Sequence, residues 1–444
     1  MKRFRIITLG CRVNQCESDS IAARLKQDGW RQQETRGLAE LVIVNTCAVT
    51  GKAAMQSRQS IRQVRRLNPD ARIIITGCYA EVEPETIHNA TGERDIIGHD
   101  DKFHIPELIA EPAEGGSLGY AHHRASSPAA VFAPTHLIPG SSRTRPVLKI
   151  QDGCNAFCSY CIVPRARGQS RSMPVDDVIE NIRLFDDAGY REVVLSGIHL
   201  GCYGLDLEPS TTLQHLLERI EHATDIDRIR LSSIEPKELT DRIIDLVARV
   251  DRFCSHFHIP LQSGDNGILR RMRRPYTAEV FAGLTRKIRN RDPDAAIGAD
   301  VLIGFPGETD EAFENTFQLV DKLPITYLHV FPFSPRAGTP AAKMPDPVPP
   351  HVQKERARRI RQLGATKRTH FYHSAIEKRL EVLIEEKRDP ETGWLKGISS
   401  NYITTLIDGP DALKNRLVHV KGISLSDDDR LLGRMLQTVR PNMA

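Results

Sequence analysis

The sequence predicts a multidomain α/β protein whose last module is a small antiparallel β-barrel. Over the first 100 residues, β-branched hydrophobic runs alternate with helical patterns, and the alternation returns at a longer period between residues 146 and 350. Such alternation is typical of parallel sheets covered by helices. From residue 373 on, short strand-like runs separated by turn residues replace it. A chain of 444 residues is long enough to bury several separate cores.

Residues 1–110 are expected to form an N-terminal domain with a doubly wound parallel sheet. Its hydrophobic runs are rich in β-branched residues and are separated by amphipathic segments. Strands are expected at 5–10, 41–46 and 72–77, and helices at 18–29 and 52–67.

Each of these three strands is followed at once by a cysteine: Cys11, Cys47 and Cys78. The carboxyl ends of parallel strands meet at one edge of a sheet, so three thiols would converge there. They form a candidate ligand set. The alternative is that small buried cysteines merely suit the ends of strands.

Residues 111–145 are rich in Gly, Pro, Ala and Ser and are read as an irregular linker. Residues 146–350 then show six strand-helix repeats, which favour a partial or closed (βα) barrel. Its strands are expected at 146–152, 192–198, 228–234, 257–263, 298–305 and 326–333. Helices are expected between them at 174–188, 212–223, 237–249, 277–290 and 309–322.

The loop after the first barrel strand carries Cys154, Cys158 and Cys161 in a C-x3-C-x2-C spacing. Structural zinc sites use four ligands, commonly in paired C-x2-C knuckles, which this spacing does not provide. Three thiolates suit a [4Fe–4S] cluster with one iron left open, and βα barrels hold their chemistry in such loops. The odd count of nine cysteines, clustered locally, also favours metal or redox chemistry over disulfides.

The chain carries basic segments that permit a nucleic-acid partner. Residues 351–372 are expected to be a basic helical connector, with seven Lys/Arg against one Glu, and two further basic runs occur at 56–66 and 268–276. The module at 373–444 holds 11 Lys/Arg and 11 Asp/Glu, so any RNA contact there depends on local patches. Its strands are expected at 379–387, 393–400, 401–408, 415–426 and 430–436.

The N-terminus lacks the features of a signal peptide, and no window approaches the ~20 apolar residues of a membrane span. We therefore expect a cytoplasmic protein with no membrane partner.

The segment CNAFCSYC (154–161) resembles the signature of radical S-adenosylmethionine (SAM) enzymes. The longer run QDGCNAFCSYCIVPRARGQSRS, the N-terminal TLGCRVNQ, VNTCAVT and TGCYA, and the five-strand terminal module together resemble the methylthiotransferases, over essentially the whole chain. LSGIHLGCYG, RLSSIEP, HIPLQSGD, DVLIGFPGET and FPFSPRAGTPAA look like the branch that acts on threonylcarbamoyladenosine in tRNA. The isopentenyladenosine branch is the nearest competitor.

The resemblance implies two [4Fe–4S] clusters, one on each cysteine trio, with the trio at 154, 158 and 161 generating the radical. It implies two roles for SAM, as the radical source and as the methyl donor. The product would carry a methylthio group at C2 of a modified adenosine beside the anticodon. The implied partners are the tRNA anticodon stem-loop and an electron donor of flavodoxin or ferredoxin type, and the terminal module would be a TRAM-like RNA-binding domain.

The resemblance also suggests contacts in the cofactor pocket, although polar residues at strand ends equally often serve internal hydrogen bonding. Ser196, Gly197 and His199 would meet the cofactor's amino group, and Tyr160, Val330 and Phe331 would flank its adenine. Ser233, Glu235 and Gln262 are candidates for ribose and carboxylate contacts. Arg336 is a candidate contact for the threonylcarbamoyl group and Tyr402 for RNA.

Three cysteines stay outside both trios. We expect Cys202 and Cys254 to be packing residues, and Cys16 is an alternative thiol for the second cluster. His256 and His258 are expected to be core histidines. Two other functions stay open: methylthiolation of an aspartate on a ribosomal protein, and a non-catalytic RNA-binding iron–sulfur sensor.

Overall fold

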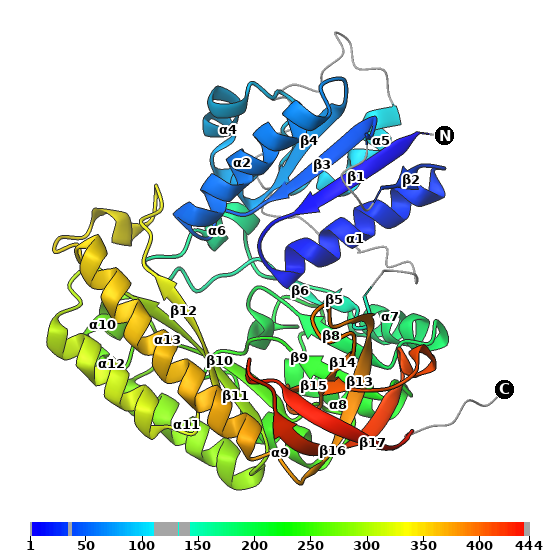
Figure 1. Cartoon of the computed structure of the whole chain (residues 1–444). Helices are drawn as coiled ribbons and strands as arrows, with labels where there is room; N and C mark the ends of the chain where they lie inside the picture. The colour runs from blue at the N-terminus through cyan, green and yellow to red at the C-terminus, as the bar shows by residue number, and fades with distance from the viewer. Residues whose placement is uncertain (1, 34–37, 111–131, 133–142, 439–444) are drawn as a thin grey trace.

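The computed structural model describes residues 2–33, 38–110, 132 and 143–438, which form an N-terminal domain, a central barrel and a C-terminal β-module (Figure 1). The N-terminal sheet is parallel in the order β2-β1-β3-β4. Its strands are β1 (Arg3–Thr8), β2 (Arg31–Gln32), β3 (Leu41–Thr46) and β4 (Arg72–Gly77). Its helices are α1 (Arg12–Gln27), α2 (Gly51–Leu67), α3 (Cys78–Val82), α4 (Pro84–Thr91), η1 (Lys102–His104) and α5 (Ile105–Ala110).

Helices cover both faces of this sheet, as the sequence predicts. Along β3, Val42 and Val44 pack into the core beneath α2, while Leu41 and Ile43 pack into a second core beneath α1 and α5. Alternate residues of a strand point to opposite faces, so a fully buried strand serves two cores at once. The sheet is therefore doubly wound.

Helix α1 begins at Arg12, six residues before the predicted start at residue 18. Its first two turns carry Asn14 and Glu17, which are fully buried against the central barrel. A hydrophobic pattern locates a helix by its apolar buried face. Here the buried face of the first two turns is polar, because its residues bind partners in another domain. The short edge strand β2 was not predicted either.

The central domain is a partial barrel of six parallel strands in two three-stranded sheets, β5-β8-β9 and β10-β11-β12. A hydrogen bond from Ile234 N to His258 O (3.0 Å) and a bridge between Ile229 and Phe253 link the two sheets. The strands are β5 (Val147–Lys149), β8 (Glu192–Ser196), β9 (Arg228–Leu231), β10 (His256–Gln262), β11 (Ala296–Ile303) and β12 (Tyr327–Pro332). Within the described residues no ladder joins β12 back to β5, so the barrel is open at the side.

All five helices predicted for the barrel are present, and shorter elements shape its loops. The five are α7 (Val175–Asp187), α8 (Leu213–Ala223), α9 (Asp241–Arg249), α11 (Ala278–Arg291) and α12 (Asp310–Lys322). The shorter elements are β6 (Gln151–Asp152), α6 (Val163–Arg167), β7 (Arg171–Ser172), η3 (Leu200–Cys202), α10 (Asn266–Arg271) and η4 (Pro340–Lys343).

The basic helix α13 (Pro350–His373) runs along β12 (Figure 1). Ala357 and Ile360 belong to the barrel core, and Arg356 pairs with Glu308 at 2.7 Å. The helix is thus part of the barrel's wall as well as the connection to the next module.

The C-terminal module is a closed five-stranded barrel in the order β13-β14-β15-β17-β16, with a short η5 (Asp411–Leu413). The predicted antiparallel arrangement is wrong for one pair, because β15 and β17 run parallel. A ring with an odd number of strands cannot close with every neighbour antiparallel, so one parallel pair is required. The strands are β13 (Arg379–Arg388), β14 (Leu395–Ser399), β15 (Thr404–Ile407), β16 (Leu417–Leu425) and β17 (Leu431–Thr438).

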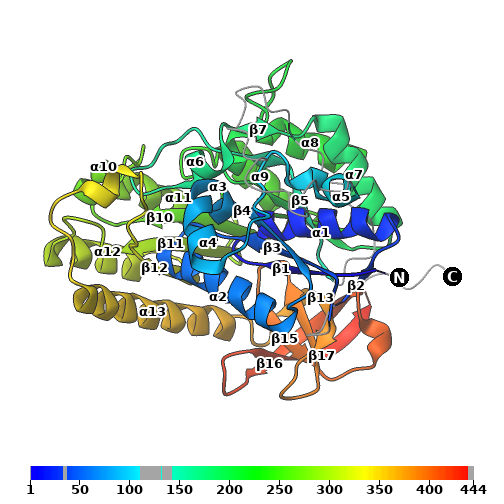
Figure 2. The same ribbon diagram turned by 90° about the horizontal axis from the view of Figure 1, so that it is seen from above.

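Two arginines of β9 fasten this module to the central barrel. The fully buried Arg228 donates to Glu381 and to Ile398 O, and Arg230 donates to Ser399 O at 3.0 Å. Seen from above, the N-terminal domain lies across the mouth of the central barrel, with the β-module at one side (Figure 2). Among the described helices, none combines the length and hydrophobicity needed to cross a bilayer.

Candidate functional site

The three strand-end cysteines of the N-terminal domain lie at one edge of its sheet. Cys11 and Cys47 follow β1 and β3, and Cys78 opens the helix after β4. Gly10 has a positive φ of 99°, and a Cβ there would lie 2.9 Å from the sulfur of Cys47. The turn before Cys11 is therefore in direct contact with Cys47, and only glycine fits. Cys11 is exposed, whereas Cys47 and Cys78 are buried.

The electrostatics of this trio suit a bound cation. Burial and the neighbouring thiols Cys78 and Cys11 raise the pKa of Cys47 to about 12, and burial likewise raises the pKa of Cys78. Thiolates that cannot ionise together in the apo protein ionise when a metal supplies positive charge. The three neighbouring thiols are a donor set that a metal cluster can use.

The second trio occupies the loop after β5 and β6. The backbone folds this loop tightly: Cys154 N donates to Gly168 O at 3.1 Å, and Cys161 N to Cys158 O at 3.0 Å. Burial and the nearby Cys158 and Cys154 raise the pKa of Cys161 to about 12. These three thiols are therefore mutual neighbours, as the spacing predicts.

Gln151 joins this loop to the segment after β8. Its Oε1 accepts from His199 N at 2.7 Å, while its Nε2 donates to the carbonyls of Asp152 and Gly153 at 2.9 Å. The side chain of His199 then lies with Nδ1 3.5 Å from the sulfur of Cys154. Ser196, at the end of β8, is buried and its carbonyl accepts from Ile150 N. Gly197 leaves room for Gln151 and lies in the same segment.

A carboxylate that the sequence did not reveal lies beside His199. Glu238 Oε1 is 2.6 Å from His199 Nε2, and Glu238 Oε2 is buried without a hydrogen-bond partner among the described residues. An orphaned carboxylate oxygen near the cysteine loop is suited to the ammonium group of a methionine-type ligand. This observation favours the SAM site expected at 196–199.

Arg274 is a second site residue that the sequence did not reveal. It is buried, its Nη1 lies 3.1 Å from the sulfur of Cys158, and its Nη2 pairs with Glu235. Glu235 is therefore held next to the cysteine loop. A fixed guanidinium at a thiolate stabilises the anionic form.

The remaining predicted cofactor residues lie in the cysteine loop, within β12, and at or just after the ends of β9 and β10. Tyr160 packs edge-on against Phe305, with ring centroids 6.5 Å apart. Gln262 ends β10 with a positive φ of 65°, and Ser233 is exposed after β9. Val330 and Phe331 lie on the open edge strand β12, where Phe331 is 42% exposed. Their contacts with a cofactor stay predictions.

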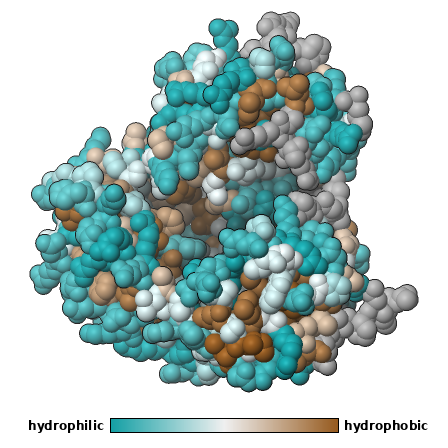
Figure 3. Space-filling model, viewed as in Figure 1, coloured by the Kyte–Doolittle hydropathy of each residue, from teal (hydrophilic) through white to brown (hydrophobic). Residues whose placement is uncertain are grey.

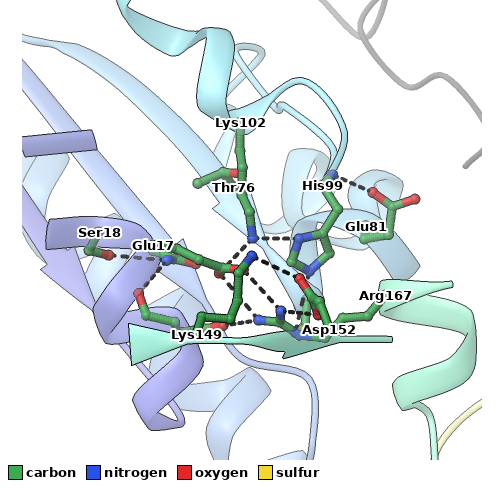
Figure 4. A network of polar contacts seen from close by, with 12 residues as sticks. Glu17, Ser18, Thr76, Glu81, His99, Lys102, Lys149, Asp152 and Arg167 are labelled. Carbon is green, nitrogen blue, oxygen red and sulfur yellow. Dashed lines mark hydrogen bonds and ion pairs between the residues drawn. The ribbon is translucent and has the colours of Figure 1, made fainter. Parts of the chain in front are cut away.

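A buried ionic network joins helix α1 of the N-terminal domain to residues on both sides of the 154–161 loop (Figure 4). Glu17 of α1 contacts Lys102, Lys149 and Arg167 at 2.5, 3.4 and 3.0 Å. Asp152, two residues before Cys154, contacts Lys149 at 3.0 Å and Arg167 at 2.8 Å. All five side chains are buried.

The network joins parts of the chain that lie next to both cysteine trios. Its members come from the helix after Cys11, from η1, from the strands before Cys154 and from the helix after Cys161, so ion pairs join segments next to both trios. Three cations face two carboxylates, which leaves one excess positive charge beside the thiols. That excess suits a neighbouring anionic metal–thiolate group.

His99 extends the network to a cysteine. Its Nε2 lies 3.6 Å from the sulfur of Cys78, and its Nδ1 lies 2.5 Å from Lys102 Nζ. Burial lowers the pKa of Lys102 to about 8, so its ammonium group is still charged at neutral pH and donates to Nδ1. The proton of the neutral imidazole is then on Nε2 and is donated to Cys78. No sequence pattern singled out His99.

Two predicted substrate residues contact other parts of the protein. Arg336 is buried and pairs with Glu83 of the N-terminal domain at 2.7 Å, so a substrate contact would require this ion pair to open. Tyr402 stacks near His256 with ring centroids 4.4 Å apart, and its hydroxyl accepts from Arg12 at 3.0 Å. Tyr402 therefore connects the C-terminal module to the residue after Cys11.

The three cysteines outside both trios have different surroundings, and one of them differs from its expected role. Cys254 is buried, as expected of a packing residue. Cys16 is buried in an apolar cluster with Val147 and Val194, which favours packing over cluster ligation. Cys202 is only half-buried, and its sulfur lies 3.5 Å from both His199 Nδ1 and Glu238 Oε1. It belongs to the polar surroundings of Cys154, so the expectation of a packing role was wrong.

The two buried histidines have partners, as expected of core histidines. His256 and His258 both contact the hydroxyl of Tyr327, at 2.8 and 2.9 Å, and His258 also contacts Asp300 at 2.8 Å.

Comparisons with known families and structures agree with this architecture. Residues 3–98 match the model described as uncharacterized protein family UPF0004, and residues 148–320 match the radical SAM superfamily. The solved structure of the radical SAM methyltransferase TsrM from Kitasatospora setae, with tryptophan and a SAM analogue, superposes with a TM-score of 0.57. It is 17% identical and covers 77% of this chain and 75% of its own, which shows the fold.

Curated relatives cover nearly the whole chain. "Threonylcarbamoyladenosine tRNA methylthiotransferase MtaB" of Bacillus subtilis is 37% identical over 93% of this chain and 92% of its own, and the Thermotoga maritima protein of the same name is 37% identical over 90% and 89%. "tRNA-2-methylthio-N(6)-dimethylallyladenosine synthase" of Pelotomaculum thermopropionicum is 33% identical over 95% of each chain. The chain belongs to the radical SAM methylthiotransferase family.

Proposed function

We propose that this enzyme methylthiolates N6-threonylcarbamoyladenosine at C2, beside the tRNA anticodon, using a second [4Fe–4S] cluster held by Cys11, Cys47 and Cys78. The observation that supports the second cluster is the buried network of Glu17, Asp152 and Arg167, which joins segments next to both cysteine trios. The four most similar of the relatives compared, at 35–37% identity, are named for threonylcarbamoyladenosine, and those named for dimethylallyladenosine are 32–33% identical, which supports the choice of substrate.

The clusters, when bound, would supply one-electron reduction of SAM at one trio and sulfur at the other. The C2–H bond of adenine has no acidity that a side-chain base exploits, which is why an enzyme of this kind needs them. The protein's own residues do the positioning. Glu238 and His199 are placed to receive the amino end of SAM, Arg274 holds Glu235 at the cysteine loop, and the hollow between the domains admits the RNA (Figure 3).

Mass spectrometry of tRNA nucleosides tests the substrate. A deletion strain is expected to lose the methylthio form of threonylcarbamoyladenosine and to regain it from a plasmid copy of the gene. An unchanged level of that nucleoside, with loss of the methylthio form of isopentenyladenosine, would reassign the substrate. Loss of neither, with a modified ribosomal-protein aspartate missing, would move the activity away from tRNA.

Metal analysis tests the second cluster independently of substrate. After anaerobic reconstitution we expect about eight iron and eight sulfide ions per chain, and about four of each in a triple Ala variant of Cys11, Cys47 and Cys78. Four of each in the unaltered protein would contradict a second cluster. Release of deoxyadenosine on incubation with reductant and SAM distinguishes the enzyme from a non-catalytic iron–sulfur sensor.

A further inference from the structure

A cavity of about 480 Å³ lies at the open side of the barrel, between β12, helix α13 and the C-terminal module. Its wall combines cationic and aromatic side chains. The cations are Arg145, Arg361, Arg368 and Lys396, and the rings include Tyr327, His329, Phe371 and Tyr402. The volume is within the range of small-ligand sites and is large enough for one nucleotide.

The charge of this cavity is not balanced by the protein. Among its lining residues, four cations face a single carboxylate, Glu385. That carboxylate already pairs with Arg145 at 2.9 Å and with Lys396 at 3.5 Å. Arg361 and Arg368 are exposed, and neither has a carboxylate partner among the described residues. A gap that only separates packed domains has no need of excess positive charge, whereas a phosphate site does.

The helix geometry places both arginines on the cavity, where Arg361 Nη2 donates to Val330 O at 3.3 Å and neither has a carboxylate partner among the described residues. Arg361 and Arg368 are seven residues apart, so they lie on the same face of α13, two turns apart. Gly364, between them, also lines the cavity, and a Cβ there would lie 3.1 Å from the side chain of Leu328 on β12. This close approach holds the arginine-bearing face beside β12.

The floor of the cavity offers flat rings. Tyr327 and Tyr402 lie with centroids 5.6 Å apart, and His329 lies 5.5 Å from Tyr327. His329 is 53% exposed, so one face of the floor is open to a ligand. Unpaired bases stack on such rings, and phosphates bind arginines, which is how single-stranded RNA is commonly held.

The cavity is linked to the first cysteine trio by a hydrogen bond, and β12 continues from it to residues expected at the cofactor. Tyr402 accepts a hydrogen bond from Arg12, which directly follows Cys11. Val330 and Phe331, expected beside the cofactor's adenine, continue along β12 from His329. A nucleotide held here would leave its neighbour in the strand near the barrel mouth.

We propose that this cavity binds one nucleotide of the unpaired RNA loop next to the target adenosine, with phosphates on Arg361 and Arg368 and a base on the rings. The proposal rests on the proposed function, because it takes the substrate to be a tRNA loop. It adds to the expected RNA contact of Tyr402 a specific cavity, with Arg361, Arg368 and His329 as the residues that hold the strand.

Fluorescence anisotropy with a labelled anticodon stem-loop RNA tests it. The double variant Arg361→Ala and Arg368→Ala should bind about tenfold more weakly, and its log–log salt slope should fall by about 1.4, because two phosphate contacts are lost. His329→Ala should weaken binding about tenfold through lost stacking, with little change in slope. The matched control is Arg219→Ala with Arg286→Ala, two exposed arginines on the outer helices α8 and α11, which should bind as the wild type does.

The outcomes separate the two proposals. If the wild type binds the RNA and the double variant binds equally well with an unchanged slope, the cavity is not the nucleotide site, and the proposed function stands. If the wild type itself does not bind the RNA, the proposed function falls and the cavity assignment with it. Circular dichroism and thermal unfolding establish that the variants are folded.

Discussion

At the scale of single residues, Cys47 and Cys154 belong to different trios, and one substitution in each should separate their contributions. Cys154→Ala should abolish release of deoxyadenosine from SAM, because the open-iron cluster needs all three thiolates. Cys47→Ala should keep uncoupled release of deoxyadenosine but give no methylthiolated product. Chromatography of the nucleosides and iron analysis measure both.

The control for these variants is Cys254→Ala, which removes a buried thiol outside both trios. Each variant could lose both deoxyadenosine release and methylthiolation while it is folded and still holds the other cluster. That result would contradict the assignment of separate roles to the two clusters.

His99 should act on the second cluster through its hydrogen bond to Cys78. Donation to a cluster sulfur raises the reduction potential, so His99→Leu should lower the midpoint potential by an amount on the order of tens of millivolts. His99→Gln, which keeps an N–H donor, should restore part of the shift. Electron paramagnetic resonance during a redox titration measures it, and His104→Leu, an exposed neighbour, is the control. Equal midpoint potentials in His99→Leu and the wild type would show that His99 does not tune the second cluster.

The cysteines could be predicted from sequence, whereas most of their partners could not. Strand-end position and spacing identified all six thiols because both are local properties. His99 and Arg274 contact Cys78 and Cys158 across 21 or more residues, and Glu238 reaches Cys154 only through His199. None of the three belongs to a local pattern. Arg336 was a candidate contact for the acidic threonylcarbamoyl group, whereas in the structure it pairs with Glu83.

At the scale of elements, Gly364 decides how closely α13 packs on β12. Gly364→Ala should change the free energy of unfolding little, because the gain in helix propensity of about 1 kcal/mol is offset by a tight contact with Leu328. Gly364→Leu should destabilise by about 1–3 kcal/mol, because the helix must move away from β12. Chemical denaturation measures both, with Ala365→Leu on the exposed face as control. A stability of Gly364→Leu equal to that of the wild type would contradict the close packing.

Element positions were largely predictable, and the exceptions have a common physical cause. The barrel strands and helices follow local hydrophobic periods, so they were found within a few residues. The early start of α1 at Arg12 and the parallel pairing of β15 with β17 depend on other domains or on closure of the whole ring. No local period contains that information.

At the scale of the whole molecule, the joint between the central barrel and the C-terminal module should make stability sensitive to acid. Burial opposes the ionisation of Glu192, but Arg230, Arg145 and Arg228 outweigh it and lower its pKa to about 2. The unfolded value is about 4.3, so the charged carboxylate contributes about 3 kcal/mol of stability above that pH. The contribution is lost as pH falls from about 4.3 towards 2.

Glu192→Gln should therefore be less stable than the wild type at pH 7, and the difference should shrink as the pH falls below about 4.3. Denaturant unfolding at a series of pH values measures it. Glu180→Gln, on the exposed face of α7, is the matched control. A difference that stays constant down to pH 2.5 would show that the Glu192 carboxylate does not carry this pH dependence.

Arg228 and Arg230 donate to backbone carbonyls of the C-terminal module, and this affects how a deletion of the module is interpreted. A protein shortened before β13 would remove the carbonyl acceptors of Arg228 and Arg230 in the wall of the catalytic domain and leave Glu192 as their shared partner. It would also leave Arg12 without Tyr402. Loss of activity on deleting the module would then report a damaged catalytic centre as much as lost RNA affinity. Point substitutions on the outer surface of the intact chain are the safer way to ask what the module recognises.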